Sequence, residues 1–462
     1  MQKNTKIVCT LGPSSDSVSE ITKLIQAGMN VARLNFSHGT YEHHKKIINN
    51  LHKAEKATNK TIGIIQDLQG PKIRIANLEN QLTLKKGQKI TFSSKEDSNI
   101  FINYKDLTKD VKKGHRIFIN DGLIETEVIQ TSPKNHIVTA KVIYGGEIKN
   151  GNGVNFPDSN ISIPTITEKD KKDLKFGLKN NVDFIALSFV KDANDIKQLR
   201  KIIKGQKIIA KIERHEAVKN LKEIIKEADG IMVARGDLGT NIPPEQVPII
   251  QKLIIKLANK YSKPVITATQ VLQSMVTESR ATRAEISDAA NAIFDHTDAI
   301  MLSNETAVGK YPFKATKTLT NVAIATETEL QKHNELIEYV KNSHQTTALN
   351  AACQNACELA LSTKANAIIL YTEDGYTPAH IARHRLYIPT ITITPKQSTK
   401  RQLTLSWGIN NILVKKFSNN NSKKVQEITD YLKKEKIVKK GQKIVILCNA
   451  SQKESIISSI KI

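Results

Sequence analysis

The sequence predicts an α/β protein: a (β/α)8 barrel with a β-barrel lid domain inserted after its third strand, followed by a C-terminal α/β domain. Its 462 residues suffice for about three domains at ~150 residues each. Eight short apolar runs, rich in β-branched residues, each precede a charged stretch of helical period. Between the third and fourth runs, residues 71–158 change to short alternating segments typical of β-hairpins.

The eight apolar runs are the expected barrel strands. They cover residues 6–12, 30–37, 62–70, 182–190, 207–213, 230–237, 264–270 and 298–305. Eight parallel strands, each followed by a helix, close a barrel of the TIM type, whose active sites lie at the C-terminal ends of the strands. The runs end in polar and charged residues, so we expect the site there.

Domain boundaries follow from the same pattern. Residues 1–70 and 159–335 are expected to form the barrel, and residues 71–158 the inserted lid above its mouth. Four further apolar runs, at residues 365–373, 388–395, 409–416 and 442–449, predict the strands of a C-terminal α/β domain, for regulation or assembly, over residues 336–462.

Composition narrows the classes of function. No run approaches the ~18 apolar residues of a membrane span, and the N-terminus lacks a signal peptide, so a cytoplasmic protein is expected. The net charge of +24 is compatible with nucleic acid or with a small anionic substrate. Only 11 of 69 basic residues are Arg and aromatics make up 5%, which disfavours nucleic acid. The cysteines, Cys9, Cys353, Cys357 and Cys448, are expected to be buried thiols.

Charged residues at the strand ends suggest phosphoryl transfer. Glu213 and Asp237 end successive strands and suit a hard divalent ion such as Mg²⁺. Lys211 stands two residues before Glu213, so both side chains point to one face; a purely structural ion pair is the alternative. Arg33 adds a planar fork of donors suited to phosphate.

Common catalytic motifs are missing from the sequence. Neither G-x4-G-K-[ST] nor G-x-G-x-x-G occurs, so a nucleotide must be held in another way. H-E-x-x-H and G-x-S-x-G are also missing, which removes support for zinc proteolysis and serine hydrolysis. His43 and His44 lie in a charged helical segment and are expected to be solvated.

Several strings together resemble the pyruvate kinase family over nearly the whole chain. They include KIVCTLGPSS (6–15), GMNVARLNFSHG (28–39), DLQGPKIR (67–74), KIERHEAVKN (211–220), IMVARGDLG (231–239) and TRAEISDAANAI (282–293). The resemblance implies the last step of glycolysis, in which phosphoenolpyruvate and ADP give pyruvate and ATP. It also implies a homotetramer, with no nucleic-acid or membrane partner.

The resemblance further implies a role for each site residue. Glu213 and Asp237 would bind Mg²⁺ or Mn²⁺, and Arg33 would contact the transferred phosphoryl group. Lys211 would stabilise that group and the developing enolate. The carboxylate of the substrate would be held by the backbone of Gly236 and Asp237 and by Thr269.

Nucleotide binding and the final proton transfer involve other residues. Arg74 and His38 resemble residues on the nucleotide side of the site. The proton donor is left open between Thr269 acting through water and the pair Ser303 and Glu305. Asn152 stands where relatives often have a nucleotide-contacting lysine.

The segment DLQGPKIR departs from the commoner family string D-T-K-G-P-E-I-R. Its Leu68, Gln69 and Lys72 replace Thr, Lys and Glu, which resembles the potassium-independent, bacterial-type branch. The Lys72 ammonium would replace the monovalent ion, so K⁺ is not expected to be required. A vestigial cation site would consist of Asn35, Ser37, Asp67 and the Leu68 carbonyl.

Two alternatives compete with this interpretation. A metal-dependent aldolase or lyase of the phosphoenolpyruvate/pyruvate barrel group would share the Glu and Asp metal site. A nonenzymatic nucleic-acid-binding protein is favoured by net charge alone.

Overall fold

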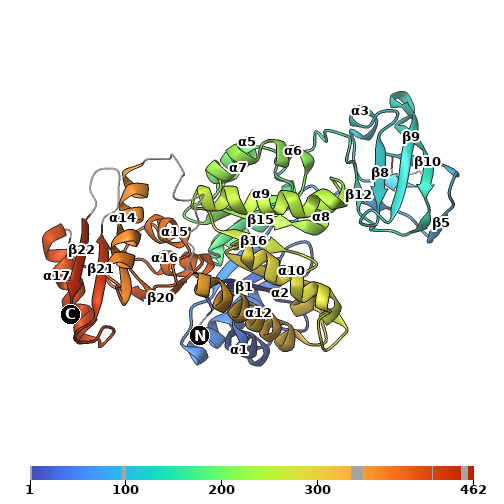
Figure 1. Cartoon of the computed structure of the whole chain (residues 1–462). Coiled ribbons are helices and arrows are strands. Elements are labelled where there is room, and N and C mark those ends of the chain that lie inside the picture. The colour runs from blue at the N-terminus through green and yellow to red at the C-terminus, as the bar shows by residue number, and fades with distance from the viewer. Residues whose placement is uncertain (1–2, 96–99, 334–346, 419, 449–455) are drawn as a thin grey trace.

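The computed structural model places three sheet-based bodies in a row, with a closed barrel in the middle (Figure 1). It describes residues 3–95, 100–333, 347–418, 420–448 and 456–462. The expected boundary between residues 335 and 336 lies outside the described residues.

The barrel consists of parallel strands in the order β1-β17-β16-β15-β14-β13-β3-β2. Each of the eight expected runs supplies one strand, so this part of the prediction is confirmed. The strands are β1 (Lys6–Thr10), β2 (Val31–Asn35), β3 (Gly63–Asp67), β13 (Phe184–Leu187), β14 (Lys207–Ile212), β15 (Gly230–Ala234), β16 (Val265–Ala268) and β17 (Ala299–Leu302).

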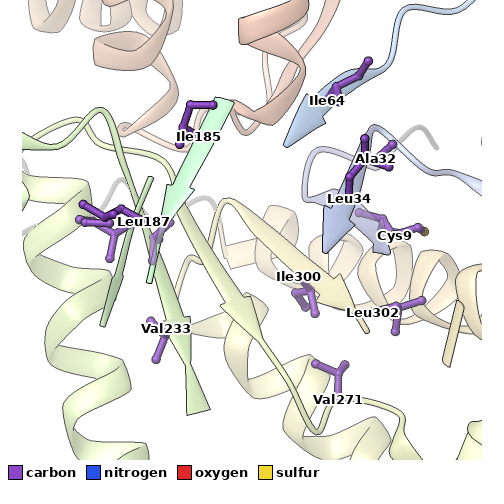
Figure 2. Packing of buried hydrophobic residues seen from close by; sticks show 14 of the residues in the cluster. Cys9, Ala32, Leu34, Ile64, Ile185, Leu187, Val233, Val271, Ile300 and Leu302 are labelled. Atoms are coloured by element: carbon purple, nitrogen blue, oxygen red, sulfur yellow. The ribbon is translucent and has the colours of Figure 1, made fainter. Parts of the chain in front are cut away.

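Helices surround the barrel and cover the outward face of its strands. Outward residues such as Leu34, Ile185 and Leu302 pack against these helices, as Figure 2 shows. Thr167 and Thr282 each begin a helix with a reciprocal capping box, which satisfies backbone donors at the helix start. The helices are α1 (Val18–Ala27), α2 (Tyr41–Thr58), α4 (Glu168–Lys179), α5 (Ala193–Ile202), α6 (His215–Lys219), α7 (Leu221–Glu227), α8 (Arg235–Gly239), α9 (Val247–Lys260), α10 (Arg283–Phe294), α11 (Asn304–Ala307) and α12 (Pro312–His333).

The part of the chain from β4 to β12 forms a separate β-body beyond one end of the barrel (Figure 1). Its seven-stranded sheet has β4 and β12 at its edges. The Ile75 amide donates to the Asn152 carbonyl (2.9 Å) and the Gly151 amide to the Ile75 carbonyl (2.8 Å), which joins these two edges. The insertion is therefore a seven-stranded sheet whose two edge segments meet, and the expectation of a lid made of a β-barrel stays a prediction. Its strands are β4 (Ile75–Ala76), β6 (Lys89–Ser93), β7 (Phe101–Ile102), β8 (Arg116–Ile119), β9 (Ile124–Ser132), β10 (Ile137–Tyr144) and β12 (Val154–Asn155), with β5 (Leu82–Leu84) and β11 (Gly146–Ile148) paired beside them and α3 (Leu107–Asp110) between β7 and β8.

The C-terminal body is a five-stranded sheet in the order β20-β19-β18-β21-β22. The four expected strands are parallel, and an antiparallel edge strand, β22 (Ile456–Lys461), was not expected. The other elements are β18 (Ala367–Tyr371), β19 (Thr390–Thr394), β20 (Ile409–Val414) and β21 (Lys443–Cys448), with helices α14 (Ala348–Ser362), α15 (Tyr376–Ala382), α16 (Gln397–Gln402) and α17 (Asn421–Lys434). All four cysteines are free and buried, as expected.

Arg401 joins the C-terminal body to the bottom of the barrel. Arg401 lies 3.0 Å from Asp183 and 2.8 Å from Glu55, and it also donates to the Ile62 carbonyl. Because all of these groups are largely buried, the arginine compensates carboxylates that water cannot reach. Within the described part of the chain, no helix combines the length and apolarity needed to cross a bilayer.

Candidate active site

The barrel interior changes from apolar to polar at the C-terminal end of its strands. Inward-facing apolar residues from all eight strands form one buried cluster, which includes Val31, Ile65 and Ile209. Because side chains alternate along a strand, the inward position two residues later belongs to the same face. At that level the chain places polar side chains: Thr10, Arg33, Asp67, Ser188 and Lys211. The polar layer is therefore a direct continuation of the core pattern.

Lys211 and Arg33 meet on the carboxylate of Asp67. The Lys211 ammonium lies 3.2 Å from Asp67 Oδ1 and 2.9 Å from Glu213 Oε1, and it donates to Ser188 Oγ at 2.7 Å. Arg33 Nε donates to Asp67 Oδ2 at 2.7 Å. Asp67, on β3, thus holds side by side one cation from the adjacent strand β2 and one from β14, which β13 separates from β3.

The position of Arg33 is fixed by a second contact. Its Nη1 donates to Thr10 Oγ1 at 3.0 Å, and this hydroxyl donates to the Leu302 carbonyl at 2.9 Å. Within the described residues, Nη2 of Arg33 has no hydrogen-bond partner, which leaves it available to a ligand. Sequence reasoning noted Thr10 only as a polar strand end.

Electrostatics keep these groups charged. Burial works to raise the pKa of Asp67, but the attraction of Lys211 and Arg33 outweighs it, so this pKa lies below its usual value. Burial works to lower the pKa of Lys211, but Asp67 and Glu213 outweigh it, so this pKa lies above its usual value. Lys211 is therefore a fixed positive charge and cannot serve as a base.

Glu213 and Asp237 fit a divalent metal ion. Glu213 Oε2 accepts the Phe189 amide at 2.6 Å, and the partner of buried Oε1 among the described residues is the Lys211 ammonium of the 2.9 Å ion pair. Burial raises the pKa of Glu213. The charge of Lys211 opposes this rise and the charge of Asp237 adds to it, so a further cation would favour the ionised form of Glu213. Over the described ranges no cluster of three or more His, Cys, Asp or Glu forms a metal cage. Two carboxylates suit Mg²⁺, which keeps water and substrate oxygens as its other ligands.

Thr269 and Gly236 lie together beside this pair. The Gly236 amide donates to Thr269 Oγ1 at 2.8 Å, and Thr269 has a φ of 65°, in the left-handed region. Arg235 holds this strained turn, because its guanidinium donates to the Thr269 carbonyl at 2.8 Å and forms a 2.7 Å ion pair with Asp288. Sequence reasoning gave Arg235 no role, since its partners come from distant segments.

Lys72, the expected potassium substitute, and Arg74, expected on the nucleotide side, lie in the segment between β3 and β4. Lys72 Nζ lies 3.5 Å from Asp237 Oδ1, and Arg74 donates to the Gly151 carbonyl at 2.7 Å. Burial lowers the pKa of His38, and the charges of Arg74, Lys72 and Arg33 lower it further. Asn152 is buried and accepts the Lys149 amide at 2.7 Å, so its side chain braces a turn.

The four groups of the expected vestigial cation site already have protein partners. Asn35 Oδ1 accepts the Ser37 amide at 3.1 Å, and the Leu68 carbonyl accepts the Ser188 hydroxyl at 2.7 Å. Asp67 contacts two cations, as described above. Asn35 Oδ1, the Leu68 carbonyl and Asp67 are thus each engaged by the protein, whereas the contact of Ser37 is made by its backbone amide.

The two residues of the proposed proton pair differ in their surroundings. Glu305 is buried, and its carboxylate accepts the amides of Ser303 (2.7 Å) and Leu272 (3.1 Å). Ser303 Oγ is also buried, but no described residue bonds to it. Glu305 is thus committed to bracing a turn, while the serine hydroxyl is available.

One expectation about histidines is wrong. His44 is buried, 5% exposed, and its ring stacks on Phe36 at a centroid distance of 4.2 Å. Its Nε2 lies 3.0 Å from the His38 carbonyl. The sequence of the charged helix did not reveal this contact, because Phe36, which covers the His44 ring, belongs to the loop before the helix.

Fold and site define a class of protein. A closed (β/α)8 barrel with two cations and two carboxylates at the C-terminal end of its strands is suited to an enzyme acting on a small phosphorylated anion. The family model described as pyruvate kinase, barrel domain, matches residues 2–316, and the model for the pyruvate kinase alpha/beta domain matches residues 350–462. The chain belongs to the pyruvate kinase family and is a phosphotransferase of glycolysis.

Individual relatives agree with this assignment. The chain is 46% identical over 419 residues to the pyruvate kinase of Geobacillus stearothermophilus, covering 88% of this chain and 71% of that protein. It is 44% identical over 420 residues to that of Staphylococcus epidermidis, covering 89% and 72%. The crystal structure of a pyruvate kinase from Cryptosporidium parvum superposes with a TM-score of 0.91 at 35% identity, over 100% of this chain and 96% of that one. The family match favours the kinase over the aldolase and nucleic-acid alternatives.

Proposed function

We propose that Arg33, Lys211 and a divalent ion on Glu213 and Asp237 carry the transfer of the phosphoryl group of phosphoenolpyruvate to ADP. One observation supports this most directly: Arg33 and Lys211 share the carboxylate of Asp67, at 2.7 and 3.2 Å. This contact brings two cations together at the barrel mouth. Phosphoryl transfer depends mainly on positioning and on charge stabilisation, which such a pair provides.

The roles follow from the contacts. A bound Mg²⁺ or Mn²⁺ would supply positive charge to the phosphoryl group and the enolate oxygen. Arg33, held at Nε and Nη1, has Nη2 left to bind a phosphoryl oxygen. Lys211 stays protonated and stabilises charge on the bridging oxygen as the bond to phosphorus breaks. Gly236, Asp237 and Thr269 bind the carboxylate of the substrate.

The proton that converts the enolate to the ketone is assigned to a hydroxyl near the site. Thr269 would act through a water molecule, and the unpartnered hydroxyl of Ser303 supports it as the second candidate. Glu305 is disfavoured because both of its oxygens accept backbone amides. The variants Thr269→Val and Ser303→Ala distinguish the two candidates. For each variant, the rate of pyruvate release is compared with the rate at which solvent protons exchange into pyruvate.

On the nucleotide side we assign Arg74 and His38. We also propose that the enzyme works without K⁺. The occupied carbonyl and amide oxygens around Asp67, and the ammonium of Lys72 beside Asp237, support this. The Lys72 charge is a fixed replacement for a monovalent ion.

Assembly and location complete the proposal. Exposed apolar side chains on α9 and α10, namely Ile249 (66%), Leu253 (45%) and Phe294 (44%), support association of this surface with another copy. We propose the homotetramer and the cytoplasmic location expected from the sequence. Light scattering during gel filtration tests the tetramer, and a monomeric mass would refute it.

The decisive experiment measures pyruvate through lactate dehydrogenase coupling. We expect pyruvate formation that requires phosphoenolpyruvate, ADP and Mg²⁺, and that is abolished by excess EDTA. Omitting ADP separates the kinase from an aldolase or lyase, which would not need it. Turnover in sodium-free and potassium-free buffer should change less than about twofold when K⁺ is added, and a rise of an order of magnitude would reject K⁺ independence.

A further inference from the structure

The backbone of Phe189 holds one oxygen of Glu213. Phe189 follows β13, which ends at Leu187. Its amide donates to Glu213 Oε2 at 2.6 Å, and among the described residues this amide is the only hydrogen-bond donor to that oxygen. The other oxygen, Oε1, belongs to the ion pair with Lys211. The orientation of the Glu213 carboxylate therefore depends on the position of the Phe189 peptide.

Phe189 has an unusual backbone conformation. Its φ is 56°, in the left-handed region, which a bulky side chain rarely adopts. Residues in this region persist only where the surrounding structure fixes them, and they cluster at functional sites. Because φ is the rotation between the amide and the Cα atom, it determines where the ring lies once the amide is bound to Glu213.

The ring of Phe189 lies against the entering connection of the inserted body, residues 68–74 between β3 and β4. Gly70 of this connection has a φ of 65°, and a Cβ atom added there would lie 3.0 Å from Phe189 Cδ2 and 2.9 Å from Ser188 Cβ. Glycine permits so close an approach. Ser188 also donates to the Leu68 carbonyl at 2.7 Å, so the two loops are packed firmly together.

The leaving connection, residues 156–167 between β12 and α4, reaches the same place. Phe189 lines a small cavity of about 40 Å³ together with Ile73 of the entering connection and with Phe156 and Ile161 of the leaving connection. The ring therefore lies beside both segments that attach the inserted body to the barrel.

This cavity also adjoins groups that contact Asp237. Asn241 lines it, and the Asn241 side-chain amide donates to the Asp237 carbonyl at 2.8 Å. Lys72 lines it as well and lies 3.5 Å from Asp237 Oδ1. Groups that hold both expected metal ligands thus surround the attachment of the inserted body.

We propose that Phe189 is a positioning residue that couples the inserted body to the metal site, since its amide fixes Glu213 and its ring contacts the two connections. The inference rests on the proposed function, in which Glu213 is a metal ligand. A shift of either connection moves the ring and the Phe189 peptide, and the Glu213 carboxylate turns with them. Such coupling is reciprocal, so bound metal also restrains the connections.

The test measures the binding of Mn²⁺ alone to the full chain, by electron paramagnetic resonance of the free ion. Phe189→Gly removes the ring but keeps the amide, and glycine adopts the left-handed φ without strain. Asn181→Gly is the matched control. Asn181 also has a left-handed φ (51°), but it precedes the same strand at the opposite end of the barrel. Phe189→Leu keeps an apolar side chain beside the connections.

We expect Phe189→Gly to bind Mn²⁺ at least about tenfold more weakly than the wild type, and Asn181→Gly to bind it within about twofold, because groups that orient metal ligands typically affect affinity by about 10- to 100-fold. The KM for Mg²⁺ in pyruvate formation should rise by a similar factor. At saturating Mg²⁺ kcat should stay within about threefold, since excess metal fills the site. Phe189→Leu should recover at least about threefold of the lost affinity.

Amide hydrogen exchange measures the reverse effect. The Val154 amide donates to the Ile73 carbonyl at 3.0 Å, which links the two ends of the inserted body. Mn²⁺ should slow exchange over residues 70–76 and 154–161 in the wild type but not in Phe189→Gly. A ring that only stabilised the fold would lower the melting temperature without removing this response.

A change of less than about threefold in the Mn²⁺ affinity of Phe189→Gly, or equal slowing of exchange in both proteins, would overturn the proposal. Glu213→Gln separates this result from a failure of the proposed function. If Glu213→Gln binds Mn²⁺ as tightly as the wild type, Glu213 is not a ligand and both proposals are refuted. If Glu213→Gln loses Mn²⁺ and Phe189→Gly does not, only the coupling is refuted. Should circular dichroism show that Phe189→Gly is misfolded, Phe189→Ala replaces it with the same expectations.

Discussion

Replacing Lys211 with methionine removes the charge on which the proposed chemistry depends most. Its ammonium lies 3.2 Å from Asp67 and 2.9 Å from Glu213, and its side chain is 10% exposed. At an effective dielectric constant of about 20, each such contact corresponds to a gross attraction of about 5 kcal/mol, most of which offsets desolvation of the ions. The same ammonium would attract negative charge that develops on the substrate at this place. Loss of one preorganised electrostatic group typically costs 10²- to 10³-fold in rate, about 2.7–4 kcal/mol.

We therefore expect kcat of Lys211→Met to fall by about 10²- to 10³-fold or more, measured by coupled pyruvate formation at saturating substrates and Mg²⁺. Lys207→Met is the matched control, since Lys207 begins the same strand at the opposite end of the barrel. It should keep kcat within about threefold. If a folded Lys211→Met enzyme kept more than a tenth of wild-type kcat, its assignment as the electrostatic stabiliser would be refuted.

Three further predictions concern other parts of the molecule. Lys72→Glu should lower turnover in K⁺-free buffer and regain at least tenfold on adding K⁺; activity independent of K⁺ would contradict the role given to Lys72. Arg401→Met leaves Asp183 without its cation and leaves Glu55 with His52 alone, and it should cost about 3–5 kcal/mol. The loss of stability is followed as a lower melting temperature. It should be smaller at pH 5 than at pH 8, because burial raises the pKa of Asp183 to about 6. A loss that does not depend on pH would contradict the role given to the Asp183 carboxylate. Burial lowers the pKa of His384 to about 3, so the unfolded chain takes up a proton there first as the pH falls below 6.5. The wild type should lose about 2 kcal/mol between pH 6.5 and 5 through this group, and calorimetry of His384→Gln should show a shallower decline; an unchanged slope would contradict it.

Much of the fold could be predicted from local pattern. The alternation of a strand has a period of two residues, so Val31 and Ile209 point inward with Arg33 and Lys211 on the same face. This local rule, together with the count of eight runs, sufficed to predict the barrel and the end of it that carries the site. Edge strand β22 was missed because its sequence is mixed and it pairs only at the margin of its sheet.

Contacts between segments that are distant in the sequence could not be predicted from local pattern. Arg235 holds the left-handed turn at Thr269, and the Glu305 carboxylate fastens the turn at Leu272. His44 is buried by Phe36 although its helix is charged. None of these pairs has a spacing that a helix or strand would reveal.

The sequence by itself determined the strands, their inward faces and the charged residues at their ends, because these depend on neighbours within a few residues. Only the tertiary structure decided that Asp67 gathers Arg33 and Lys211, and that the Phe189 backbone meets Glu213. Closing the barrel and docking the C-terminal body bring together residues up to hundreds of positions apart. These contacts are determined by the packing of the whole chain, which no local periodicity encodes.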